Sequence, residues 1–152
     1  MRTIKDVNGD EWKIPALTVG RVIDIREYAE IDFLEMRGKG GDDAKTAAGQ
    51  TLAKLYDAMT LGNVLWVLLK EQCEKRNVDE RAFGYLFDAS QFGELREAVL
   101  NAVVDFTQPP TVAKEIKADL PGMISRMENA LIAVWKNSVT DSAESLELTP
   151  AA

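Results

Sequence analysis

The stretch QFGELREAVLNAVVDFTQPP, residues 91–110, constrains the fold of this chain more than any other feature. Its apolar residues recur at the three- and four-residue steps of one helix face, and polar residues, Arg96 among them, fill the other face. The apolar stripe comprises Phe92, Leu95, Val99, Ala102, Val103 and Phe106. Pro109 and Pro110 then stop the helix, because proline cannot continue it and restricts the preceding residue. The stretch predicts a two-faced helix whose stripe must be covered.

A second helix is predicted in the apolar centre of the chain, within residues 51–77. One wide face is formed by Leu61, Val64, Leu65 and Leu68, at helical spacing. Trp66 and Leu69 extend the apolar surface around the cylinder, so we expect this helix to be buried on more than one side. Asn77 closes it after a cationic end, where the helix dipole favours positive charge.

The N-terminal residues 1–14 predict a β-hairpin. Asn8-Gly9 is a strong two-residue turn signal, because both residues tolerate the positive φ that a type I′ turn requires. The register of such a turn sets Val7 opposite Asp10, Lys5 opposite Trp12, and Thr3 opposite Ile14. Val7, Trp12 and Ile14 then share an apolar face, which must dock on the rest of the protein or on a partner, because an isolated hairpin is marginal in water.

Shorter signals organise the rest of the chain. Thr18 and Asp79 are suited to cap the N-termini of helices, and Pro121 suits the first turn of a last helix. The apolar face of that last helix comprises Ile124, Met127, Leu131, Val134 and Trp135. No internal repeat or sustained heptad pattern is visible. Residues 37–50, rich in Gly, Lys and Asp, predict a mobile loop.

The predicted fold class is mainly α: a small helical bundle with an N-terminal β-hairpin. We expect a single domain over residues 1–137, which includes the hairpin 1–14 and the mobile loop 37–50. The Ser-, Thr- and Ala-rich residues 138–152 offer little apolar surface to bury, so we expect a flexible C-terminal tail.

The residue inventory argues against catalysis. The chain has no histidine, the commonest general base and metal ligand, and a single cysteine, Cys73, which excludes an intrachain disulfide or a thiolate zinc site. The adjacent Asp42 and Asp43 lie in the expected loop, and GGDDAKT (residues 40–46) lacks the glycine spacing of a phosphate-binding loop. We expect a non-enzymatic protein without catalytic residues, cofactor or metal, in which Cys73 is passive.

Charge and hydropathy indicate which partners to expect. The net charge of −7 disfavours nonspecific binding to nucleic acid and to anionic membranes, which are polyanions. The longest apolar run, residues 64–69, is too short to span a bilayer, and the first residues lack a signal peptide pattern, so we expect a cytoplasmic protein.

The aromatic and apolar stripes favour a hydrophobic core, with a groove for a partner's helix as the alternative. In that alternative, apolar contacts hold the partner while negative charge keeps the complex dispersed. The residues expected to bind the partner are Trp66, Phe83, Phe92, Leu95, Val99, Val103 and Phe106.

The order of these segments resembles the tail assembly chaperones of long-tailed bacteriophages. An apolar helix ending VLLKEQCEKRNVDERAFGYLF precedes an Asp/Ser break and then FGELREAVLNAVVDFTQPP. The residues that carry the resemblance are Val67, Leu68, Phe83, Leu86, Ala98, Ala102, Asp105, Phe106 and Pro109. The closing VWKNSVTDSAESLELTP also looks like the helix-to-tail region of that family, and the resemblance covers about residues 10–150. The Asn8-Gly9 hairpin is a departure, because the family does not require it.

The resemblance implies a chaperone that binds the tape measure protein, keeps it soluble and helps to recruit tail tube subunits. It also implies a location in the host cell cytoplasm and absence from the mature virion, with homo-oligomerisation left open. In many phages a programmed frameshift near the end of the gene appends a second domain, for which residues 138–152 are a sensible junction. The alternatives are a structural phage protein, such as a head–tail joining or minor tail component, or another non-enzymatic helical adaptor.

Overall fold

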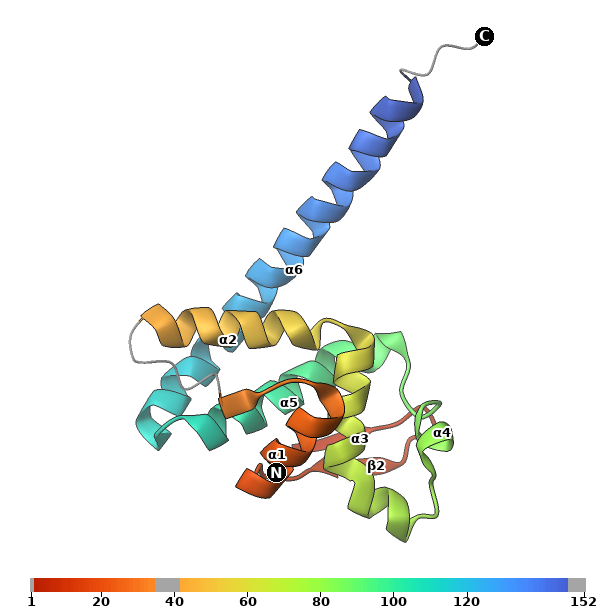
Figure 1. The fold of residues 1–152 in the computed structure, drawn as a ribbon, viewed down its shortest axis with the longest axis vertical. Coiled ribbons are helices and arrows are strands. Elements are labelled where there is room, and N and C mark those ends of the chain that lie inside the picture. The colour runs from red at the N-terminus through yellow and green to blue at the C-terminus, as the bar shows by residue number, and fades with distance from the viewer. Residues whose placement is uncertain (1, 35–41, 148–152) are drawn as a thin grey trace. The chain divides into compact units, whose positions relative to one another are not determined.

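The structure, a computed structural model, describes residues 2–34 and 42–147, with side chains for 2–34 and 49–140. As predicted, the chain is mainly α, a small helical bundle with an N-terminal β-hairpin (Figure 1). It divides into two compact units, Met1–Ile116 (unit 1) and Lys117–Ala152 (unit 2). The predicted single domain over residues 1–137 thus differs from the observed division, which falls earlier in the chain.

The N-terminal hairpin forms, but its register is one residue from the predicted one. It comprises β1 (Arg2–Lys5) and β2 (Glu11–Ile14), which pair antiparallel. Ile4 lies opposite Trp12, where Lys5 was predicted. Because a one-residue shift turns every side chain to the other face, Ile4 joins Trp12 and Ile14 on the buried side. Val7, predicted on that side, is 49% exposed.

The register is set by the carboxylate of Asp6, which organises a longer loop than the predicted two-residue turn. It accepts hydrogen bonds from the backbone N–H groups of Asn8 (2.8 Å) and Asp10 (3.0 Å). Its second oxygen accepts one from the indole Nε1 of Trp12 at 2.8 Å. Gly9 supplies the positive φ of 84° that the loop needs. Asp6 is buried, and the hydrogen bonds from these three donors offset the free energy that its carboxylate loses when it leaves water.

The hairpin docks on the helices of unit 1 through backbone-directed hydrogen bonds. The side-chain amide of Gln72 forms two hydrogen bonds with the backbone of Lys13. Its oxygen accepts one from the N–H group (3.0 Å), and its nitrogen donates one to the carbonyl (2.7 Å). Arg76 donates to the carbonyl of Glu11 at 2.6 Å, and its guanidinium carbon lies 4.0 Å from the centroid of the Trp12 ring. The expected docking of the hairpin on the rest of the protein is therefore confirmed.

Helix α1 (Val19–Ala29) begins at the predicted cap, since the hydroxyl of Thr18 accepts a hydrogen bond from the N–H of Arg21 at 3.2 Å. It ends at Glu30, whose φ of 57° is left-handed. The buried residues of this helix, Val22 and Ile25 among them, face the neighbouring α3.

Helices α2 (Asp42–Leu55) and α3 (Ala58–Lys75) follow. The mobile loop predicted over residues 37–50 is wrong for 42–50, which belong to α2, and its first residues, 37–41, lie outside the described residues. In α3 the predicted wide face is buried and extends to Leu69 and Cys73.

Two short helical turns connect α3 to α5. The first, α4 (Glu80–Phe83), begins at the predicted cap, where Asp79 accepts from the N–H of Ala82 at 2.8 Å. The second, the 3-10 turn η2 (Ala89–Gln91), is held by a capping box of Asp88 and Gln91. These local caps fix the break that the sequence predicts before α5.

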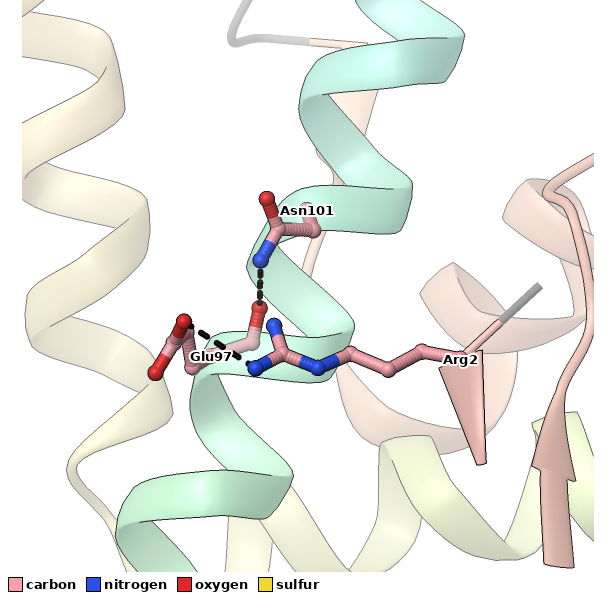
Figure 2. Close-up of polar contacts among 3 residues, drawn as sticks. All are labelled: Arg2, Glu97 and Asn101. Carbon is pink, nitrogen blue, oxygen red and sulfur yellow. Dashed lines mark hydrogen bonds and ion pairs between the residues drawn. The ribbon is translucent and has the colours of Figure 1, made fainter. Parts of the chain in front are cut away.

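Helix α5 (Phe92–Thr107) ends immediately before the double proline, as predicted. Figure 2 shows a contact between β1 and α5, in which Arg2 forms a 3.1 Å ion pair with Glu97. Within α5, the side-chain amide of Asn101 donates a hydrogen bond to the backbone carbonyl of Glu97 at 2.8 Å.

Helix α6 (Pro110–Glu147) differs from the prediction at both ends. It starts at Pro110 and runs through Pro121, which was predicted to begin a separate helix. It also includes residues 138–147 of the predicted tail, while residues 148–152 lie outside the described residues. Pro110 suits the first turn of a helix, because its missing N–H has no intrahelical partner there.

Candidate functional site

The stripe of α5, predicted to bind a partner, is largely covered within unit 1. Leu95 and Val99 are each 1% exposed, and Val103 is fully buried. Phe92 and Phe106, at the two ends of the stripe, are half-buried. Strands β1 and β2 and helix α3 pack against α5. The three central residues are therefore core residues, and the prediction of a partner-binding surface along them does not fit the structure.

Trp66 and Phe83, the two predicted partner-binding residues outside α5, meet in an aromatic cluster. The ring centroid of Phe83 lies 5.4 Å from that of Trp66, 6.4 Å from Trp12 and 5.8 Å from Phe87. Tilted and edge-on pairs of this kind contribute about 0.5–1.5 kcal/mol beyond their buried area. Phe83 is buried and Trp66 half-buried. The cluster joins β2, α3 and α4, so its first role is to hold unit 1 together.

Arg96 lies in the core, although the pattern of α5 predicted it on the polar face. It is 8% exposed, and its Nε donates to the carbonyl of Leu55 at 3.1 Å. Its guanidinium carbon lies 3.7 Å from the centroid of the Tyr56 ring. Leu55 is the last residue of α2, where the helix dipole favours a cation. Arg96 thus links α5 to the end of α2, and its aliphatic stem covers apolar surface.

The exposed apolar surface of unit 2 lies on α6. Five large apolar residues of this helix are 45–67% exposed: Leu131, Ile132, Val134, Trp135 and Val139, which we call the α6 face. All residues from 128 to 140 are exposed. Leu131, Val134 and Trp135 belong to the apolar face that the sequence predicts for the last helix. The structure places these three residues on α6 and leaves them exposed.

The other exposed large apolar residues lie outside the α6 face, with two of them on α1 and one at the start of α6. They are Val7, Val19, Tyr28, Met59, Tyr85 and Val112. Single exposures of this kind are ordinary on protein surfaces, whereas a contiguous patch marks an interaction site. The α6 face is therefore the candidate functional site.

Two titratable side chains in the described part of unit 1, Cys73 and Tyr28, have raised pKa values. Burial raises the pKa of the Cys73 thiol to about 11, an effect that the nearby Arg76 only partly offsets. The thiol is protonated at neutral pH and matches the passive cysteine that the sequence predicts. The hydrogen bond that Tyr28 donates to the Glu80 carboxylate raises the pKa of the phenol. Among the side chains that the structure describes, in residues 2–34 and 49–140, no group of His, Cys, Asp and Glu is arranged to hold a metal ion.

Hydropathy along the described helices identifies no single helix that is long and apolar enough to cross a membrane. The segments Gly49–Leu55 and Ala58–Lys75 reach the required length and composition only when taken together, and they are bent by 92° from one another.

The described residues thus define a small, mainly helical protein with a docked hairpin and an exposed apolar helix face. A scan against protein-family models and searches of curated proteins and of solved structures each found no match.

Proposed function

We propose that this chain is a tail assembly chaperone of a long-tailed bacteriophage, which binds the tape measure protein and keeps it soluble while tail tube subunits are recruited. The proposal is supported by the resemblance in segment order and by the mainly helical fold. It includes action in the host cell cytoplasm and absence from the mature virion. It includes no catalytic step, in keeping with a chain that has no histidine.

The observation that carries the proposal is the α6 face. An exposed apolar stripe on a helix can hold an amphipathic client helix at its i, i+3 and i+4 positions. Trp135, 66% exposed, offers a large anchor of the kind that dominates such contacts. The net charge of −7 opposes aggregation of the complex once the client's apolar surface is shielded. We therefore propose α6, and not the covered stripe of α5, as the client site.

Co-expression with the tape measure protein of the same genome tests the proposal. We expect the wild-type chain to raise the soluble fraction of the tape measure protein several-fold. The double substitution Leu131→Asp with Trp135→Asp should remove that gain, because two charges on the α6 face oppose apolar contact. Met59→Asp with Tyr85→Asp is the matched control: it adds the same charge at exposed apolar residues outside α6 and should keep the gain.

Two outcomes would contradict the proposal: an unchanged soluble fraction with the wild-type chain, or full activity of the α6 variant. Mass spectrometry of purified virions separates the chaperone from a structural tail component. We expect the chain to be absent from mature particles, and its stoichiometric presence would favour the structural alternative.

A further inference from the structure

Residues 77–91, which connect α3 to α5 and which we call the strap, are anchored to unit 1 by few side chains (Figure 1). Between residues 74 and 94, all of which the structure describes, Phe83 is the only buried residue. By contrast, helix α3 buries six residues and helix α5 buries eight. A segment with few buried apolar side chains opens at a lower free energy than the core beside it.

The main anchor of the strap, Phe83, fills a site whose walls belong to other elements. Its ring centroid lies 5.4 Å from that of Trp66 in α3 and 6.4 Å from that of Trp12 in β2. Trp12 is also held by groups outside the strap, since its indole donates a hydrogen bond to Asp6 and the guanidinium of Arg76 lies over its ring. The walls of the site therefore do not depend on the strap, and removal of Phe83 would expose them.

Beyond its junction with α3, the strap is tied to the described part of unit 1 by single hydrogen bonds. The donors and acceptors are the Tyr28 hydroxyl with the Glu80 carboxylate, the Val7 N–H with the Leu86 carbonyl at 2.8 Å, and the Gln91 side-chain amide with the Lys5 carbonyl at 2.7 Å. Surface hydrogen bonds contribute little net free energy, because water replaces either partner when they break. The cap at Asp79 and the capping box of η2 lie within the strap and do not hold it to unit 1.

We propose that the strap opens from unit 1 as one segment while α1, α3, α5 and the hairpin stay folded, and that this opening exposes aromatic surface of Trp12 and Trp66. The strap begins at Asn77, whose left-handed φ of 55° already ends the helical backbone of α3, so opening does not have to unwind that helix. The hairpin keeps its hydrogen bonds to Gln72 and Arg76 of α3. The inference concerns unit 1 alone and depends neither on α6 nor on the proposed chaperone function.

Native-state hydrogen exchange of the full chain, followed by NMR, tests the proposal. The amide of Phe83 donates within the strap, and we expect the opening that exposes it to be at least about tenfold more populated than the opening that exposes the buried amides of α3. The amide of Val7 should exchange together with that of Phe83, because its acceptor, the carbonyl of Leu86, belongs to the strap. The amide of Asp6 donates within the hairpin loop at 3.0 Å and should stay protected.

Two aromatic substitutions in the strap form a matched pair. Phe83→Ala should raise the population of the open strap at least about tenfold, because it removes the buried ring. Tyr85→Ala removes a ring that is 74% exposed and should leave exchange unchanged. Phe83→Leu, which retains apolar bulk, should produce a smaller rise at the same amides and serves if the alanine variant does not fold.

A substitution outside the strap separates its opening from unfolding of unit 1. Val103→Ala leaves a cavity at a fully buried site of α5, so it should speed exchange of the buried amides of α3, which need unfolding of the core. It should not change exchange at Phe83 and Val7, because α5 stays packed when the strap opens.

Three results would overturn the proposal. The first is exchange of the strap amides no faster than that of the buried amides of α3 in the wild-type chain. The second is an equal effect of Val103→Ala on both sets, since the strap would then open only when unit 1 unfolds. The third is a Val7 amide that exchanges like that of Asp6, or an effect of Phe83→Ala no larger than that of Tyr85→Ala.

Discussion

Helices α5 and α6 carry apolar rows of the same kind, yet the row of α5 is largely covered and that of α6 is exposed from residue 128 onward. Val103 of α5 is fully buried, whereas Val134 of α6 is 67% exposed. Both strands of the hairpin and α3 pack against α5, while all residues of α6 from 128 to 140 are exposed. An apolar row therefore predicts that a helix face is to be covered and leaves open what covers it.

The two rows also differ in the use of their burial free energy. Burying a Val or Leu side chain contributes about 1.5–3 kcal/mol. In α5 that free energy stabilises unit 1, whereas the exposed residues of α6 do not contribute it within the described residues; by our proposal they contribute it on binding a client helix. Equal substitutions in the two helices should accordingly change different quantities: folding in α5 and association in α6.

The substitution Val103→Asp should have the largest effect on folding. It places a carboxylate at a fully buried site in the middle of the α5 row, and should destabilise unit 1 by more than about 4 kcal/mol. The same change at Val134 should alter the unfolding free energy of unit 1 by no more than about 0.5 kcal/mol. Urea unfolding followed by circular dichroism measures both.

The comparison of the two helices breaks if Val103→Asp unfolds at the wild-type urea concentration, or if Val134→Asp abolishes the cooperative transition of unit 1. Either result would mean that the coverage of the two rows is not as the structure describes.

Arginine offers a second matched pair. Arg96→Ala in α5 should destabilise unit 1 by about 2–4 kcal/mol, because it removes a charged hydrogen bond to Leu55 and the contact over the Tyr56 ring. Arg126→Ala, at an exposed site of α6, should cost less than about 0.5 kcal/mol. Thermal unfolding of both variants checks the difference. Equal losses would indicate that Arg96 is not buried between α5 and α2.

The features that sequence alone predicted correctly are local ones. The caps at Thr18 and Asp79 depend on a side chain and an N–H group three residues apart, so a short stretch contains the whole interaction. The stop of α5 before Pro109 depends on covalent geometry. The fold class followed from such signals, because helical spacing and turn chemistry act over a few residues.

The predictions were wrong where the structure depends on more than a few neighbouring residues. The hairpin register depends on Asp6, whose carboxylate reaches across the loop to the indole of Trp12, and the Asn8-Gly9 signal does not contain that contact. The extent of α6 shows the same limit. An interior proline removes a backbone hydrogen bond at a cost of about 3 kcal/mol, so the sequence pattern favoured a first turn at Pro121, yet α6 runs through it.

The candidate site was the hardest feature to predict, because exposure is a property of the packed unit. For Phe83 and Val103 the pattern favoured a core, with a partner-binding groove as the alternative, and the burial of both residues agrees with the core. The spacing of Leu131 and Val134 was visible in the sequence, but nothing in it distinguished a covered from an uncovered face. Arg96 was predicted on the polar face because it was treated as a charged residue, although the aliphatic part of an arginine side chain can cover apolar surface.

The single thiol of the chain, Cys73, allows the reactivity of a buried site to be compared with that of an exposed site on α6. Burial raises the pKa of Cys73 from an ordinary 9.0 to about 11, which lowers its thiolate fraction at pH 8 about a hundredfold. A thiol at an exposed site of α6, made by Val134→Cys in a Cys73→Ala background, should react with a disulfide reagent at least that much faster. Equal rates would show that the covered face of α3 opens readily or is not covered.

The same thiol adds a pH dependence with a defined sign. Its folded-state pKa is raised, so below about pH 9 both states are protonated and the neutral buried thiol is fully compatible with folding. As pH rises toward about 11, the unfolded chain loses its proton first and unfolding is favoured, by at most about 2 kcal/mol. Cys73→Ala should lack this component, so its unfolding free energy should fall less than that of the wild type between pH 8 and 11. Val134→Cys in that background should not restore the fall, because an exposed thiol has the same pKa in both states. If it does, residue 134 becomes buried on folding and the distinction between α5 and α6 is lost.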